Sequence, residues 1–161
     1  MNEQAILNEW NRNIAHLYKQ LSKNNKRPYN GGTTSNSELE LLGKQFIGSK
    51  FIGVFAVDSK INLGKLKQAY FIINNDKIGQ PGQHWLAVVK SNNNLYVHDT
   101  FGRPSKKLIK VFYDKMYGSG YNIKDTDNDK EQGPYQMDCG IRAVSSLMIA
   151  KKYGVKAFLK L

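Results

Sequence analysis

One side chain of the sequence is a strong candidate nucleophile: Cys139, the single cysteine of the chain. A lone thiol is most often a small buried hydrophobe. Cys139, however, lies where a helix is predicted to begin, and the free N–H groups and dipole of a helix N-terminus stabilise a thiolate. A cysteine nucleophile also needs a base, and the base needs an acid that orients it. The fold would therefore have to bring a histidine and a carboxylate to Cys139.

The base has three candidates, because the chain contains three histidines. His16 falls on the polar side of a predicted helix, where we expect it to be solvated. His98 is followed directly by Asp99, but neighbouring residues of a strand point to opposite faces, so these two cannot easily pair. His84 is left as the best partner for Asp99.

The elements that must position this pair form a predicted hairpin. Two apolar runs, 84–90 and 95–99, are separated by the polar segment 91–94, which indicates two antiparallel strands and their turn. His84 opens the first strand and Asp99 closes the second. The hairpin therefore brings their ends together, which is the geometry that a base and its orienting acid require.

The remaining pattern predicts an α+β fold with a small, mostly antiparallel sheet packed with helices. Apolar residues at helical spacing and β-branched runs mark the elements. Helices are predicted over 4–21, 105–117 (capped by Ser105) and 139–154, a short helical turn over 38–42, strands over 51–57 and 70–73, and loops over 22–37 and 125–131. We find no domain boundary and expect a single domain over 1–161.

Composition and charge restrict the partners and the compartment that we expect for this domain. The chain has 161 residues and a formal net charge of +11, an excess that attracts polyanions and makes non-specific DNA a candidate partner. One cysteine allows no intrachain disulfide and no cysteine-based zinc cluster. The N-terminus lacks the pattern of a secretory signal, and no apolar run approaches a membrane span. We expect a soluble, monomeric protein of a reducing compartment, with no membrane partner.

Four short motifs carry a resemblance to a known family. They occur in the family's order and at near-family spacings, and they read Gly82-Gln83-His84-Trp85, Asp99-Thr100-Phe101-Gly102, Gln132-Gly133-Pro134 and Cys139-Gly140. The segment 79–150 that contains them resembles the adenovirus-type maturation cysteine proteases, as found in virophages and other small DNA viruses. The segment 42–55 has a weaker resemblance to the N-terminal glycine-rich segment of the family.

Two departures from the adenovirus enzyme bear on this resemblance. The acid is Asp99 where that enzyme has glutamate, and Asp138 before the cysteine resembles the related SUMO-type proteases. In those relatives, however, the glutamine lies six residues before the cysteine, whereas Gln132 lies seven before Cys139. The sequence therefore resembles the viral enzyme more closely than the SUMO-type proteases.

The resemblance implies the roles of the site residues and the order His-Asp-Cys, which is permuted relative to papain. Cys139 would be the nucleophile, His84 the base and Asp99 its orienting acid. Gln132, with the backbone N–H of Cys139, would stabilise the oxyanion. Trp85 would support the substrate or the oxyanion, although ordinary core packing explains it equally well.

The resemblance also implies a substrate class and a location for the protein. The protein would be an endopeptidase that cleaves capsid and core precursor proteins, after small glycine-containing motifs, in the virion or in the virus factory of the host cell. It requires no cofactor by sequence. DNA or a non-covalent activating peptide remain candidate activators, since a disulfide-linked peptide would consume Cys139.

Other functions stay open at this point. A deubiquitinase or SUMO-like isopeptidase would act on host modifiers, an acyltransferase would use the same cysteine and histidine, and a basic DNA-binding virion protein would have no activity. The pair Gly31-Gly32 resembles a cleavage site for self-processing, although glycine pairs in loops are common in turns. No metal is expected, because the run Asp125-x-Asp127-x-Asp129 lacks the glycine and glutamate of a calcium loop.

Overall fold

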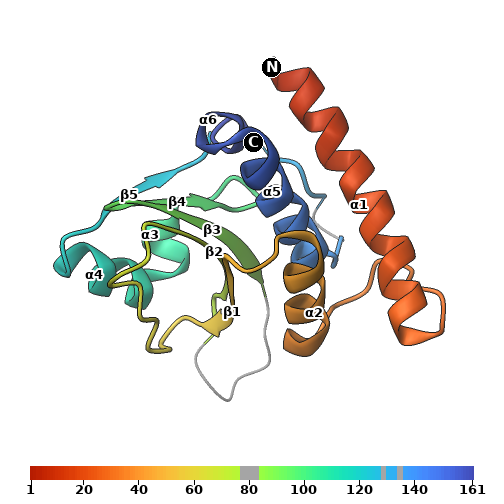
Figure 1. Ribbon diagram of the computed structural model, residues 1–161, viewed down its shortest axis with the longest axis horizontal. Helices are drawn as coiled ribbons and strands as arrows, with labels where there is room; N and C mark the ends of the chain where they lie inside the picture. Colours follow the sequence, from red (N-terminus) through yellow and green to blue (C-terminus); the bar gives the residue numbers. More distant parts are fainter. Residues whose placement is uncertain (77–83, 128–129, 134–135) are drawn as a thin grey trace.

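A five-stranded sheet covered by helices on both faces forms the framework of the protein (Figure 1). The structure is a computed structural model and describes residues 1–76, 84–127, 130–133 and 136–161. The strands lie in chain order across the sheet: β1 (Phe51–Ala56), β2 (Gln68–Asn74), β3 (Trp85–Ser91), β4 (Asn94–His98) and β5 (Asn122–Asp125). The predicted α+β class is confirmed.

The sheet is mixed, so the prediction of a mostly antiparallel sheet is correct only for its centre. Its centre is antiparallel, in the pairs β2–β3 and β3–β4. Its two outer pairs, β1–β2 and β4–β5, are parallel. Parallel neighbours need a crossover connection, and the helical segment between β4 and β5 supplies one. The strand β5 was not predicted because it has four residues and only alternate partial burial.

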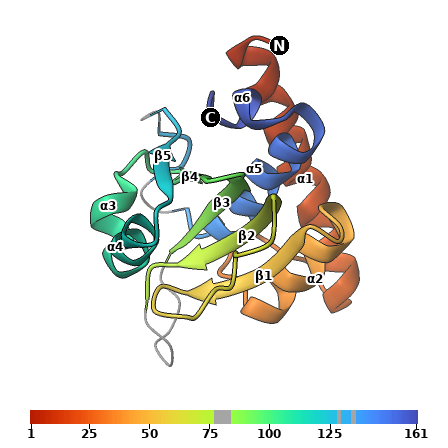
Figure 2. The same ribbon diagram turned by 60° about the vertical axis from the view of Figure 1, so that its left-hand side comes forward.

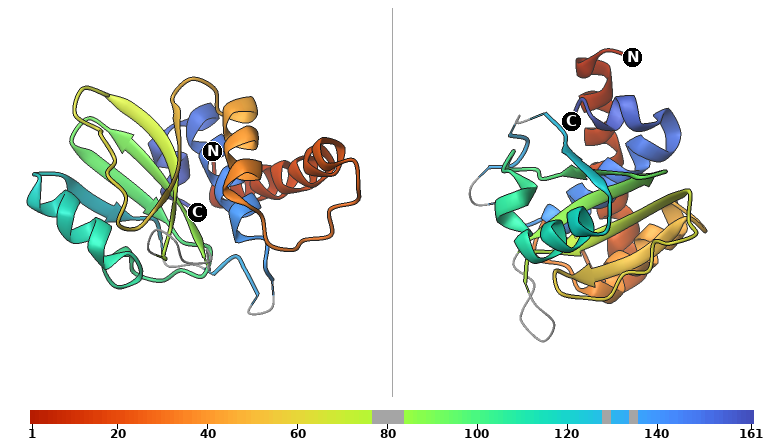
Figure 3. Two further views of the ribbon diagram at one scale, coloured as in Figure 1. Left: turned by 90° about the horizontal axis from the view of Figure 1, so that it is seen from below. Right: turned by 90° about the vertical axis from the view of Figure 1, so that its left-hand side faces the viewer.

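Three long helices cover one face of the sheet. They are α1 (Glu3–Asn25), α2 (Asn36–Phe46) and α5 (Cys139–Tyr153), and Figure 3 shows all three on the same side. The helix α5 lies next to β3 and is itself covered by α1. Trp10 joins these two helices, donating from Nε1 to Ser146 Oγ at 2.9 Å and accepting at its carbonyl from Ser145 Oγ at 2.8 Å.

The opposite face is covered by two shorter helices, α3 (Ser105–Leu108) and α4 (Lys110–Gly118), as Figure 2 also shows. Phe71 of β2 and Phe112 of α4 pack edge to face in this second core, with ring centroids 6.0 Å apart. The sheet is therefore buried on both sides, which explains why its central strands are almost continuously apolar.

The predicted single helix over 105–117 is divided in two. Ile109, fully buried, has φ −127° and ψ 51°, which interrupts the helix between α3 and α4. Ser105 was predicted to cap this helix, but it does not. The N-cap is Pro104, and the backbone N–H of Ser105 donates to Asp125 Oδ2 at 3.1 Å.

The turn predicted over 38–42 is the middle of a complete helix, α2. Ser35 and Glu38 form a capping box at its start, in which each side chain accepts from the other's backbone N–H. The helix continues through Gly43, where we had expected it to end. A Cβ on Gly43 would lie 2.2 Å from the ring of Phe51, so the glycine allows close packing there rather than a stop.

The last predicted helix begins at Cys139, as expected, and ends before Gly154, whose φ is 88°. A further short helix, α6 (Val155–Phe158), was not predicted. The predicted strands 51–57 and 70–73 correspond to β1 and β2 within two residues. Among the described helices, none is both long and apolar enough to cross a membrane.

Candidate active site

The hairpin β3–β4 brings His84 and Asp99 together, as the sequence predicts. His84 lies directly before β3 and Asp99 directly after β4, and Nε2 of the histidine forms a hydrogen bond with Oδ1 of the aspartate. Both side chains are almost fully buried. The backbone of His84 is fixed as well, because it exchanges hydrogen bonds with Asn75 at the end of β2, through Oδ1 and N of the asparagine, each at 3.1 Å.

The second carboxylate oxygen of Asp99 is held by Arg103. Oδ2 accepts from the backbone N–H of Arg103 at 2.9 Å and from its Nε at 3.0 Å. Burial opposes the ionisation of Asp99, but the hydrogen bonds from His84 and Arg103 outweigh it and hold the pKa of Asp99 far below its ordinary value. The carboxylate therefore stays charged beside His84. Arg103 was not predicted, although its four-residue distance from Asp99 was a usable signal.

Cys139 completes the group at the first residue of α5. It is buried, with 6% of its surface exposed, and its side chain interacts with that of His84. Burial lowers the pKa of His84, whereas the hydrogen bonds to Asp99 and Cys139 raise it, and the net direction is upward. Since Asp99 occupies Nε2, Nδ1 is the ring nitrogen left for the thiol. Such an arrangement can hold an imidazolium beside a thiolate.

One aromatic ring lies against His84, and a second is buried in the core that contains Cys139. The ring of Phe101 lies 5.2 Å from that of His84, and the guanidinium of Arg103 covers Phe101 at 4.9 Å. Trp85 begins β3 opposite Asn74 and is buried in the same core as Cys139. Core packing therefore accounts for the observed position of Trp85.

Gln132, the candidate oxyanion donor, is buried and held at both ends of its amide. Its Oε1 accepts from Thr100 Oγ1 at 2.5 Å, and its Nε2 donates to the carbonyl of Gln136 at 2.5 Å. Thr100 directly follows Asp99 in the sequence. The structure thus attaches Gln132 to the chain segment that carries the acid of the site.

A buried ionic group lies beside the nucleophile and was missed by the sequence reasoning. Asp138 accepts from Arg142 Nε at 2.7 Å and from the hydroxyl of Tyr18 at 2.5 Å. Arg142 also donates from Nη1 to the carbonyl of Glu131 at 2.8 Å. These contacts connect the start of α5 to α1 and to the segment that carries Gln132. The four-residue spacing of Asp138 and Arg142 was the available signal.

The segment between α1 and α2 passes over the start of α5. A Cβ on Gly140 would lie 2.4 Å from Thr34 Oγ1, so only glycine fits next to Cys139. Gly31 has φ +93°, and a Cβ there would lie 2.9 Å from the hydroxyl of Tyr18. The carbonyl of Gly32 accepts from Tyr29 at 2.5 Å. The glycine pair singled out for self-processing therefore lies on this side of the molecule.

The other histidines lie apart from the catalytic candidates. His98 is buried, with Nδ1 2.8 Å from Thr126 Oγ1 and Nε2 3.4 Å from Glu131 Oε2, so it does not pair with Asp99, as predicted. His16 is exposed on α1, where it contacts Phe46.

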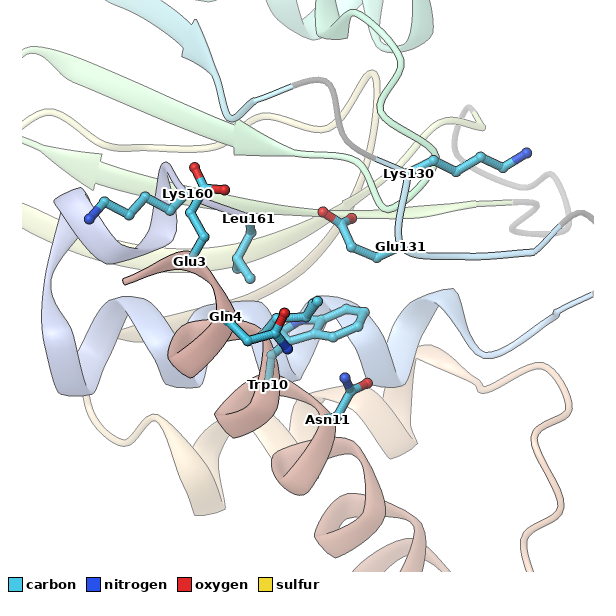
Figure 4. A pocket seen from close by; sticks show the side chains of 9 residues that line it. Glu3, Gln4, Trp10, Asn11, Lys130, Glu131, Lys160 and Leu161 are labelled. Atoms are coloured by element: carbon cyan, nitrogen blue, oxygen red, sulfur yellow. The ribbon is translucent and has the colours of Figure 1, made fainter. Parts of the chain in front are cut away.

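A cavity of about 420 Å³ lies near the start of α1 and the end of the chain. Figure 4 shows Trp10 on one side of it and Glu131 on the other, with Lys130 extending away. The cavity does not contain the catalytic candidates in its lining, which is formed by Glu3, Gln4, Leu7, Trp10, Asn11, Lys130, Glu131, Lys160 and Leu161.

Four residues of the sequence motifs lie outside the described residues: Gly82, Gln83, Asp129 and Pro134. The chemistry of the site consequently rests on the described side chains of His84, Asp99, Gln132 and Cys139. No protein-family model matches the sequence, and no curated protein sequence matches it.

Proposed function

We propose that the protein is a cysteine endopeptidase with Cys139 as its nucleophile. The observation that carries this proposal is the buried chain of contacts from Cys139 through His84 to Asp99. A thiol at a helix N-terminus, a histidine within its reach and a carboxylate on the far ring nitrogen are the parts that nucleophilic acyl transfer needs.

In the proposed reaction, His84 takes the proton of Cys139, and the thiolate sulfur attacks the carbonyl carbon of a peptide bond. The carbon–nitrogen bond then breaks, and His84 returns the proton to the leaving amine. A water molecule, deprotonated by His84, hydrolyses the thioester and regenerates the thiol. Asp99 fixes the ring of His84 and stabilises its charged form throughout.

Gln132 is the proposed side-chain donor to the oxyanion. One hydrogen of its amide goes to the carbonyl of Gln136, and the amide carries a second. The backbone N–H of Cys139 belongs to the first turn of α5, where N–H groups have no partner within the helix. Loss of one such donor typically costs about 100- to 1,000-fold in rate.

The proposed substrates are capsid and core precursor proteins that are cut after small, glycine-containing motifs, and the proposed places are the virion and the virus factory. The motifs in the sequence support this part of the proposal. The chemistry requires no cofactor. DNA or a non-covalent peptide are the proposed activators.

The charge of the protein supports an interaction with DNA. Four exposed lysines lie at the end of α5, on α6 and just after it, and contribute to the net charge of +11: Lys151, Lys152, Lys156 and Lys160. Cys139 occupies the opposite end of α5, about 20 Å away at 1.5 Å per residue. A polyanion bound at these lysines would therefore leave the site open, and its affinity would fall steeply with salt.

The test is cleavage of a glycine-containing peptide library by the wild-type protein and by Cys139→Ala, with and without duplex DNA. Mass spectrometry would locate the cut bonds. We expect cleavage after glycine by the wild type only. Equal cleavage by both proteins would exclude the proposed nucleophile, while reaction with ubiquitin-type probes but not with peptides would indicate an isopeptidase.

A further inference from the structure

We propose that Thr100 is a positioning residue that anchors the Gln132 amide in its observed direction. This inference rests on the proposed function, because it concerns the oxyanion donor of that reaction. Thr100 contacts Gln132 rather than substrate, so its role would be exerted entirely through the glutamine.

Thr100 holds the segment that carries Gln132 at two points. Its carbonyl accepts from the backbone N–H of Glu131 at 2.8 Å, and its hydroxyl donates to Gln132 Oε1 at 2.5 Å. Only 2% of Thr100 and 3% of Gln132 are exposed. At this burial a hydrogen bond fixes its partner strongly, because water does not compete for it.

The direction of the amide follows from its two partners. The carbonyl of Gln136 can only accept, so it requires the NH₂ end of the Gln132 side chain. The oxygen end must then face Thr100, whose hydroxyl can donate to it. If the amide flipped, its oxygen would face the carbonyl oxygen of Gln136, and two acceptors would meet. The carbonyl of Gln136 thus selects which end of the amide faces Thr100, and the Thr100 hydroxyl then anchors the oxygen end there.

Two consecutive residues directly after β4 would therefore hold both the base and the oxyanion donor. Asp99 orients the base His84 through its carboxylate. Thr100 anchors the oxyanion donor Gln132 through its hydroxyl. The base and the oxyanion donor would then keep a fixed relation to each other, since both are attached to one short segment.

The test compares Thr100→Val, which keeps the branched shape without the hydroxyl, with Thr100→Ser, which keeps the hydroxyl. Ser145→Ala is the matched control, because it also removes a buried hydroxyl donor, to the carbonyl of Trp10, outside the site. For each protein, kcat and KM would be measured on a fluorogenic peptide with two glycines before the reporter. The rate of alkylation of Cys139 by iodoacetamide would be measured separately, because alkylation forms no oxyanion.

We expect Thr100→Val to lower kcat about 10- to 100-fold, less than loss of the amide itself. KM and the alkylation rate should stay within about twofold, Thr100→Ser should restore kcat, and Ser145→Ala should keep it. In a Gln132→Ala background, Thr100→Val should have almost no further effect, because the two residues act as one unit.

Unchanged kcat in Thr100→Val would overturn the positioning role, and so would an equal loss in the Gln132→Ala background. If Thr100→Val does not fold, Thr100→Ala replaces it in the comparison with Thr100→Ser. Failure of the proposed function has a different signature, which is a wild-type protein that cleaves no peptide with or without DNA. In that case the role of Thr100 falls with it.

Discussion

Nε2 of His84 is bonded to Oδ1 of Asp99 across the open end of the β3–β4 hairpin, fifteen residues apart in the chain. The hairpin itself produces this contact, since one residue precedes its first strand and the other follows its second. The start of α5 then adds Cys139 to the pair. Each of these placements has a measurable consequence.

Replacement of the acid should move the pH dependence of catalysis. The hydrogen bond to Asp99 helps to raise the pKa of His84 above 6.5, so Asp99→Asn should lower it. The reactive form needs a protonated His84 beside the thiolate, and the alkaline limb of kcat/KM should therefore shift to lower pH. The maximum rate should fall by about 100-fold or more. A pH–rate profile checks this, and an unchanged alkaline limb would show that Asp99 does not act on His84.

Asp99 should also contribute to stability in a defined pH range. Its pKa is lower in the folded protein than the ordinary value of 3.8. The ionised carboxylate therefore stabilises the fold above about pH 4, and this contribution is lost as the pH falls through the folded-state pKa. Urea unfolding at several pH values should show Asp99→Asn less stable than wild type at pH 6, with the gap closing toward pH 2. A constant gap would contradict this linkage.

Removal of the oxyanion donor should affect turnover without affecting the nucleophile. Gln132→Ala should lower kcat about 100- to 1,000-fold, while alkylation of Cys139 by iodoacetamide proceeds at the wild-type rate. Gln20→Ala, which changes a glutamine of α1 whose side chain donates to Asn24, is the control and should retain full activity. Wild-type turnover by Gln132→Ala would assign the oxyanion to other donors.

Removal of one partner of the buried ion pair beside the nucleophile should destabilise the protein strongly. Arg142→Met leaves the carboxylate of Asp138 buried without its cation, and we expect a loss of about 3–5 kcal/mol in the free energy of unfolding. The double variant with Asp138→Asn should recover part of this loss, because the uncompensated charge is gone. Urea denaturation of the single and double variants measures the difference. A double variant no more stable than Arg142→Met would show that the charge is not the cause.

Gly43 should be intolerant of a single added methyl group. A Cβ at this position would lie 2.2 Å from the Phe51 ring, so Gly43→Ala should destabilise the protein by about 1–3 kcal/mol through overpacking. Gly118→Ala is the control, because nothing lies within 4 Å of its added Cβ. Thermal unfolding should give a lower Tm for the first variant and an unchanged or higher Tm for the second. Equal Tm values would mean that Phe51 moves aside freely.

The sequence was most informative where short-range rules apply. A polar four-residue segment between two apolar runs was enough to predict the hairpin, and with it the meeting of His84 and Asp99. The start of α5 at Cys139 followed from helical periodicity. The sequence was less informative where contacts join distant segments: Thr100 and Gln132 are 32 residues apart, and no local pattern links them.

The errors in the predicted fold also come from contacts between distant segments. The parallel pairing of β4 with β5 depends on a crossover connection, and β5 itself is too short and too weakly apolar to be recognised. The break falls at Ile109, a buried residue of the second core and not a typical helix breaker, so no local pattern predicts it. Arg103 was overlooked although it lies four residues from Asp99, because the burial of that carboxylate, which makes the contact important, was not predicted.

The most direct measurement is the rate at which iodoacetamide alkylates Cys139 at pH 7, in the wild-type protein and in His84→Gln. The chain has one cysteine, so intact-mass spectrometry reports that thiol alone. If His84 activates Cys139, the wild type should react at least about tenfold faster than the variant, since only the thiolate is nucleophilic. The same slow rate in both proteins would contradict the activation of Cys139 by His84, and with it the proposed peptidase.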